Sequence, residues 1–170
     1  MSLVLARVDQ RLLHGQVAVG WVPVLDADRI WIADDATASD DFAREVVGSA
    51  APPGATVEVF SIPEAAARLA GAVPGRTLLL VRSPGDLLRL IEAGASIALA
   101  NVGGLHWREG ARRFLDYVYV TPEDLDALRA LAARGVRLVA RDLPGNPAVD
   151  LVAALADGSL EFDHLSSRRS

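Results

Sequence analysis

Short apolar runs alternate with longer amphipathic segments along the chain. The short runs are rich in leucine, valine and isoleucine, and they predict β-strands over residues 3–6, 29–33, 56–60, 76–82, 96–100, 116–120 and 136–140. The longer segments predict helices over residues 16–25, 39–49, 63–70, 84–93, 122–134 and 148–156. Several of these helices are preceded by a side chain suited to capping, and we expect the N-caps to be Ser39, Ser61, Ser83 and Thr121.

The order of these elements predicts the fold class. Strands that alternate with helices favour an α/β fold with an open, mostly parallel, twisted β-sheet of about seven strands and helices on both faces. The unbroken apolar run at 78–81 is typical of a central strand that is buried on both faces. The chain has 170 residues. We expect a single domain over residues 1–165, followed by a frayed polar tail at 166–170.

Composition narrows the possible functions. The net charge of −5 argues against bulk attraction to nucleic acid or to an anionic membrane. The chain has no cysteine, so disulfides, zinc–thiolate sites and cysteine nucleophiles are excluded. No signal peptide and no apolar run of roughly 18 residues is visible, and we expect a cytoplasmic protein. Neither a nucleotide-binding loop nor a metal-ligand spacing is present, so no cofactor and no metal are expected.

Charged and polar side chains gather at the first strand-to-helix turn, where Arg7, Asp9, Arg11 and His14 fall within eight residues. Such a turn lies at the carboxyl edge of an α/β sheet, where ligands bind. A single histidine is more often structural, but His14 stands just ahead of a predicted helix whose free amides attract anions. These observations make His14 a candidate for a histidine that carries a phosphoryl group.

The neighbours of His14 suggest supporting roles. Arg11 is either a surface residue or a fork that holds two phosphoryl oxygens. Asp9 is either a loop cap or an ion-pair partner of Arg7 or Arg11, or it is the group that orients the imidazole or locks Arg11. The backbone at Gly15 and Gln16 is expected to bind the phosphate through its amides.

A second group of residues follows the predicted fifth strand. Asn101, Gly103 and Gly104 form either a plain turn or, if the first and fifth strands are neighbours, a wall whose amides face the same anion. The basic residues of this region and of the first turn are either solvated or form a docking face for an acidic partner; those considered for docking are Arg7, Arg108 and Arg112. His106 and His164 are interpreted as structural, and Asp34 as a capping residue.

Four stretches carry a family resemblance: residues 7–17 (RVDQRLLHGQV), 50–54 (AAPPG), 101–104 (NVGG) with 108–110 (REG), and 121–136. Together they resemble the IIB components of the bacterial phosphotransferase system, mannose/fructose/sorbose class. The resemblance extends over about residues 5–139. The chain departs from the family pattern at Gln10, at Leu13 and at His106-Trp107, where a more apolar pair is common.

The resemblance implies a cytoplasmic phosphocarrier in sugar transport, that is, a protein-phosphohistidine–sugar phosphotransferase. Such a protein accepts a phosphoryl group from a phosphorylated IIA partner, holds it on Nδ1 of a histidine that matches His14, and passes it to a sugar bound by the membrane components IIC and IID. Two other readings stay open: a stand-alone regulatory phosphoprotein, and a module that binds an anion without covalent chemistry. Whether the protein forms a homo-oligomer also stays open.

Overall fold

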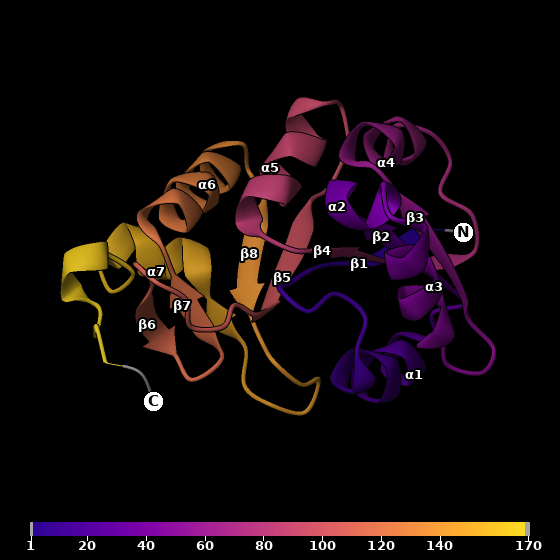
Figure 1. Ribbon diagram of the computed structural model, residues 1–170. Coiled ribbons are helices and arrows are strands. Elements are labelled where there is room, and N and C mark those ends of the chain that lie inside the picture. Colours follow the sequence, from indigo (N-terminus) through magenta and orange to yellow (C-terminus); the bar gives the residue numbers. More distant parts are fainter. Residues whose placement is uncertain (1, 169–170) are drawn as a thin grey trace.

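The computed structural model describes residues 2–168 and is built on a seven-stranded sheet (Figure 1). The strands stand in the order β3-β2-β4-β1-β5-β8-β9, and every neighbouring pair is parallel except the antiparallel β8–β9 pair. Two further strands, β6 and β7, form a separate antiparallel pair. The bounds are β1 Ser2–Asp9, β2 Arg29–Ala33, β3 Thr56–Phe60, β4 Arg76–Val81, β5 Leu99–Gly104, β6 Arg112–Leu115, β7 Val118–Val120, β8 Arg137–Ala140 and β9 Val149–Asp150.

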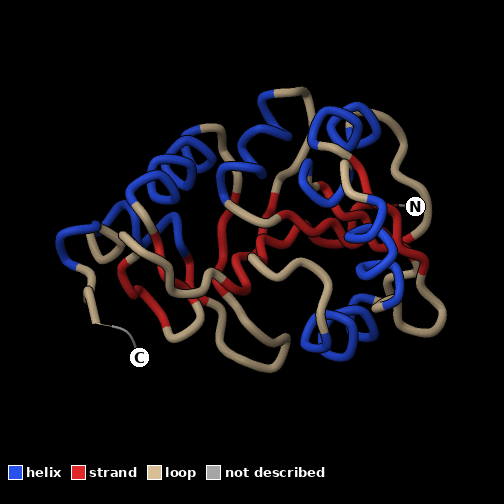
Figure 2. Tube along the Cα trace, viewed as in Figure 1, coloured by secondary structure: helices blue, strands red, loops and turns tan. Residues whose placement is uncertain are grey.

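Helices cover both faces of the sheet. Alternate residues of a strand point to opposite faces, so Trp31 belongs to one core cluster and Ile32 to the other. The first cluster lies under α4 to α7, and the second under η1, α1 and α3 (Figures 1 and 2). The bounds are η1 Gln16–Trp21, α1 Val22–Leu25, α2 Asp35–Ala38, α3 Asp41–Ser49, α4 Ile62–Leu69, α5 Pro84–Glu92, α6 Pro122–Ala133, α7 Leu151–Asp157 and η2 Phe162–His164.

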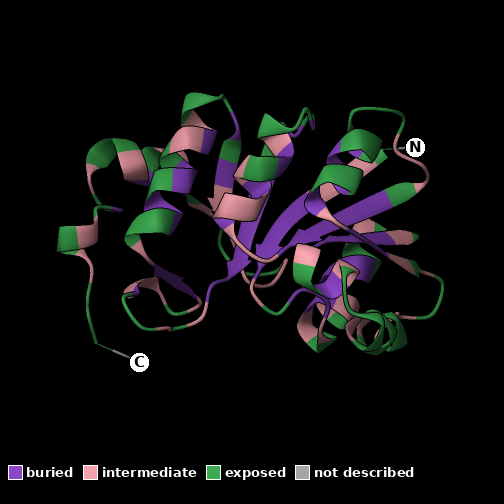
Figure 3. Cartoon of the chain, turned by 45° about the horizontal axis from the view of Figure 1, so that its top comes forward, coloured by how far each residue is buried: buried purple, intermediate pink, exposed green. Residues whose placement is uncertain are grey.

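The predicted α/β architecture is confirmed. The strands at 29–33 and 56–60 agree with the expected ranges, and the caps at Ser61, Ser83 and Thr121 each accept a hydrogen bond from a backbone amide three residues later. The central strands are buried along most of their length (Figure 3). Hydrophobic pattern and capping chemistry are local properties, which is why these features could be predicted from sequence.

Several predicted boundaries of helices and strands were wrong. The expected helix at 39–49 is α3, which begins at Asp41 because Asp40, and not Ser39, caps it. A separate short helix, α2, is capped by Asp34 and was not predicted. The first strand runs on to Asp9, and the fifth occupies residues 99–104 and not 96–100. Strands β6 and β9 were not predicted at all.

The C-terminal segment is held more firmly than expected. The amide of Arg113 donates a 2.8 Å hydrogen bond to the carbonyl of Ser166, so the chain is still paired where a frayed tail was predicted to begin. Residues 169 and 170 of that tail lie outside the described residues. Within residues 2–168, none of the helices combines the length and apolarity that crossing a membrane requires.

The topology places the first turn at a switch point of the sheet. Strand β1 lies between β4 and β5, which confirms that the first and fifth strands are neighbours. After β1 the chain crosses towards β2, whereas after β5 it leads to β8 on the other side. Ligands bind at such points in open α/β sheets, beyond the carboxyl ends of the strands.

Candidate functional site

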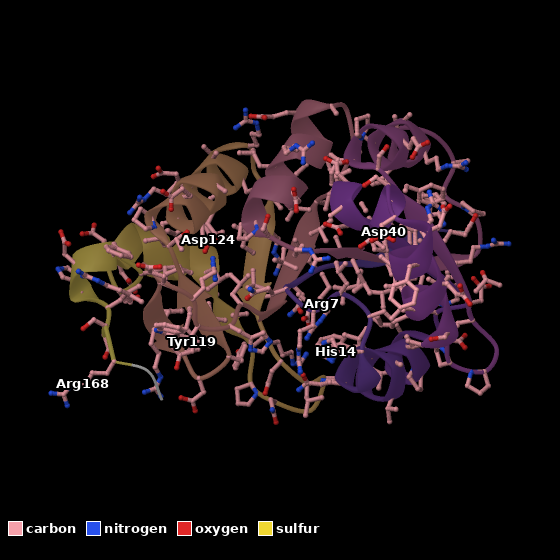
Figure 4. All side chains as sticks on the ribbon, viewed as in Figure 1. Arg7, His14, Asp40, Tyr119, Asp124 and Arg168 are labelled. Carbon is pink, nitrogen blue, oxygen red and sulfur yellow. The ribbon has the colours of Figure 1, made fainter. Side chains whose placement is uncertain are left out.

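Three side chains form a chain of contacts at the end of β1. The carboxylate atom Oδ2 of Asp9 lies 2.9 Å from Nε2 of His14 and 3.1 Å from Nη2 of Arg7. The side chains of Arg7 and Asp9 are fully buried, whereas 16% of the His14 side chain is exposed. Among the described residues nothing is bonded to Nδ1 of His14, so the carboxylate holds one ring nitrogen and leaves the other available. Figure 4 shows His14 at the start of the first helix, close to Arg7.

The turn that follows β1 is folded around Asp9. Its Oδ1 accepts the amide of Arg11 at 3.1 Å, and its carbonyl accepts the amide of Leu12 at 2.9 Å. Leu12 has a φ of 57°, which costs about 1–2 kcal/mol for a residue with a Cβ atom. Its side chain is 2% exposed within the core below η1, and this burial offsets the backbone strain. The hydrogen bonds to Asp9 and the burial of Leu12 therefore hold the strained backbone of this turn together.

Arg7 is the centre of a buried network and not a docking residue. Its Nη1 donates to Oδ1 of Asn101 at 2.6 Å and to the carbonyl of Arg141 at 3.0 Å, and its Nη2 donates to the carbonyl of Asp142 at 3.2 Å. Its guanidinium also lies over the ring of Trp21. Burial lowers the pKa of Arg7, while the Asp9 carboxylate acts in the opposite direction. The prediction that Arg7 docks a partner was wrong, because β1 extends to Asp9 and the Arg7 side chain is fully buried.

The second group of predicted phosphate-binding residues lies behind Arg7 and Asp9. Asn101, Gly103 and Gly104 are buried within strand β5 and do not form a turn, and the Asn101 side chain is bonded to Arg7 and to the carbonyl of Arg141. A Cβ atom at Gly103 would lie 1.8 Å from Cζ of Arg7, and one at Gly104 would lie 3.2 Å from Oδ1 of Asp9. These residues form a wall that supports the Arg7–Asp9 pair.

The remaining predicted residues, Arg11, Gly15 and Gln16, flank His14 in the turn and at the start of η1. Arg11 is exposed, and its Nη2 donates to Oε1 of Gln16 at 3.2 Å. Gly15 is in a helical conformation, and a Cβ added there would meet nothing within 4 Å, so the surface is open at this point. The helix η1 is a π-helix over its whole length, a form found frequently at functional sites.

A second arginine positions the turn from the other side, and sequence reasoning missed it. Nη1 of Arg82 donates to the carbonyl of Gln10 at 3.0 Å, while its Nε and Nη2 bind the two oxygens of Asp34 at 3.2 and 2.9 Å. Burial would raise the pKa of Asp34, but hydrogen bonds from Arg82 and Thr37 outweigh it and lower that pKa. Arg82 and Asp34 directly follow β4 and β2, and this shared place at strand ends was the available signal.

The other two predicted docking residues have internal partners. Arg108 forms an ion pair with Asp124 and donates to the carbonyl of His106 at 3.1 Å. Arg112 lies over the ring of Phe162 and donates to its carbonyl at 2.8 Å. Both arginines therefore hold parts of this chain together, which the sequence spacing did not indicate.

Known proteins share both the sequence and the fold of this chain. Residues 3–165 match the family model described as "PTS system sorbose subfamily IIB component". The sorbose-specific EIIB component of Klebsiella pneumoniae is 36% identical over 154 residues, with 89% of this chain and 94% of that protein covered. The fructose-specific EIIB component of Bacillus subtilis is 36% identical over 157 residues, with 91% and 96% covered. The crystal structure of the IIBSor domain of the sorbose permease from Klebsiella pneumoniae superposes with a TM-score of 0.86, at 34% identity, covering 95% of this chain and 99% of that one.

Proposed function

We propose, for a chain that belongs to the sorbose-subfamily IIB components of the phosphotransferase system, that Nδ1 of His14 is the atom that carries the phosphoryl group. A IIB component of this system is a sugar phosphotransferase, and its family implies IIA and IIC/IID partners. The observation that supports the proposal is the contact between Asp9 and Nε2 of His14. It commits Nε2 to the carboxylate and leaves the lone pair of Nδ1 for the incoming phosphorus.

The buried pair of Arg7 and Asp9 explains how the imidazole is prepared for the transfer. The Nδ1 lone pair attacks phosphorus while the bond from phosphorus to the donor nitrogen breaks. The proton stays on Nε2 of His14, where it is hydrogen-bonded to Asp9, and the carboxylate compensates the positive charge that develops on the ring. Arg7 holds Asp9 in place through a 3.1 Å contact between two fully buried side chains.

Arg11 is proposed to stabilise the transferred group on the exposed side of the ring. Its backbone is fixed by Asp9, whereas its guanidinium is bonded, among residues 2–168, to Gln16 alone and at the surface. A fork of this kind can bind two phosphoryl oxygens after it releases the Gln16 oxygen. We further propose that the amides of Gly15 and Gln16 face the same oxygens and that residues 1–165 act as one domain.

Intact-mass measurement tests these assignments after incubation with a phosphorylated IIA partner. The wild-type protein is expected to gain one acid-labile phosphoryl group and the His14→Ala variant none, while His164→Ala, altered at a distant surface histidine, is expected to gain one. Asp9→Asn keeps the shape of the side chain but disturbs the tautomer, and it is expected to slow acceptance about 10²–10⁴-fold. Normal acceptance by His14→Ala, or a phosphoryl group found on Nε2 by ¹⁵N spectroscopy, would refute the proposal.

A further inference from the structure

The side chain of His106 takes no part in the contacts described above, although it is close enough to His14 for the two rings to interact electrostatically. Strand β5 ends at Gly104, which pairs with Asp9, and two residues later the amide of His106 donates to Oε1 of Gln10 at 2.8 Å. The Gln10 side chain therefore ties the second loop to the first. The arrangement brings a second imidazole to the edge of the sheet that holds His14.

The ring of His106 is unpaired. Its Nε2 is buried and finds no hydrogen-bond partner among residues 2–168, and no bond to its Nδ1 is found there either. A buried polar atom without a partner costs about 1–3 kcal/mol, and such atoms in native proteins call for an explanation. Within the described part of the chain no hydrogen bond holds the ring in its present orientation, so a rotation towards a new partner would break none.

The charges around His106 favour the arrival of an anion. Burial lowers the pKa of His106, the positive charge of Arg11 lowers it further, and a charge on His14 acts in the same direction, while Asp9 opposes them. On its own loop, Arg108 holds the carbonyl of His106 but is committed to Asp124. In the unphosphorylated site, the positive charges near His106 thus oppose protonation of its ring. A phosphoryl group with a charge near −2 would instead favour the protonated ring.

We propose that His106 is a second group that binds the phosphoryl group on His14, taking up a proton from solvent and donating a hydrogen bond to a phosphoryl oxygen when the group arrives. The inference rests on the proposed function of His14. No covalent bond is made or broken at His106, and the proton leaves again for solvent when the phosphoryl group is passed on. His106 therefore stabilises the loaded state through direct contact with the phosphoryl group.

The proposal predicts the direction in which phosphoryl acceptance changes with pH. A group whose pKa is higher in the loaded than in the unloaded state stabilises the loaded state most at low pH and loses this effect as pH rises through the higher pKa. Between the two pKa values, the equilibrium constant for phosphoryl acceptance is expected to rise up to about tenfold for each pH unit lowered. This contribution is separate from any titration of the donor, because it disappears when His106 is replaced.

An NMR titration of the histidine rings in ¹⁵N-labelled protein tests the proposal without a mutation. The pKa of His106 is expected to rise by about one unit or more when His14 is phosphorylated by a phosphorylated IIA partner. His164, whose ring is bonded to the carbonyl of Gly158 in the C-terminal segment, is the internal control and is expected not to move. A change at His106 no larger than that at His164 would overturn the inference. Failure of His14 to become phosphorylated would instead overturn the proposed function.

A pair of variants provides a second test. His106→Gln keeps a hydrogen-bond donor but cannot take up a proton, and His164→Gln is the matched control. The equilibrium for phosphoryl acceptance by His106→Gln should lose the additional pH dependence seen in the wild type and in His164→Gln. A merely structural role would lower acceptance equally at every pH, so parallel pH profiles for wild type and His106→Gln would contradict the proposal.

Discussion

The Gly103→Ala substitution tests the buried network most directly. Strand β5 passes so close to Arg7 that a Cβ atom at residue 103 would lie 1.8 Å from Cζ, 1.9 Å from Nη1 and 2.1 Å from Nη2. The end of an arginine side chain normally moves aside at little cost. Here it is held by Asn101, by Asp9 and by the carbonyls of Arg141 and Asp142, in a fully buried position. The methyl group must therefore separate Arg7 from its partners.

The expected loss of unfolding free energy follows from separating Arg7 from Asp9. Removing one partner of a buried ion pair costs about 3–5 kcal/mol because the other charge stays buried without compensation, and separating Arg7 from Asp9 is expected to cost a similar amount. The backbone at Gly103 has no positive φ, so the added Cβ brings no conformational penalty of its own. With an m value of about 2 kcal/mol/M, the urea midpoint should fall by about 1.5–2.5 M. Phosphoryl acceptance should slow as well, because Asp9 loses the group that fixes it.

A double-mutant cycle with Arg7→Ala, measured by urea unfolding, checks the explanation. Without the guanidinium there is nothing for the Cβ atom to strike, so adding Gly103→Ala to Arg7→Ala should cost less than about 1 kcal/mol. Gly15→Ala is the matched control: its Cβ meets nothing within 4 Å, and it should change stability by about 0.4–1 kcal/mol in the favourable direction. If Gly103→Ala lowered the unfolding free energy equally in the wild type and in Arg7→Ala, the clash with Arg7 would not be the cause of the loss.

Two further predictions concern the turn and its support. Because the folded-state pKa of Asp34 lies below its unfolded value near pH 4, the stabilisation from its pair with Arg82 is present above that pH and is lost as pH falls through the folded pKa. Asp34→Asn should therefore flatten the fall in unfolding free energy below about pH 4, and an unchanged acid profile would contradict this assignment. At Leu12, relief of the positive φ is worth about 1–2 kcal/mol and should match or exceed the usual penalty for glycine of about 0.5–1 kcal/mol. Thermal unfolding should thus find Leu12→Gly at least as stable as Leu12→Ala, and a clearly less stable glycine variant would show that the turn is not strained.

The amino-acid sequence by itself determined the fold class, most of its elements and the candidate phosphohistidine. These properties depend on residues that are near one another in the chain. Ser61 and Thr121 cap their helices through amides three residues ahead, and the strands at 29–33 and 56–60 are apolar runs bounded by turns. The motif around His14 is likewise continuous in sequence, so its residues could be recognised without knowing how the chain folds.

Only the tertiary structure decided which polar residues of the site face solvent. Arg7 and Asn101 are 94 residues apart, and their contact exists because β1 and β5 pair in a register that sets Arg7 opposite Asn101. In this pairing β1 extends to Asp9 and β5 to Gly104, further along the chain than their local patterns indicate, so Asn101 to Gly104 form a buried wall and not an anion-binding turn. Strand pairing is a long-range choice governed by packing on both faces of the sheet, so no local pattern specifies it.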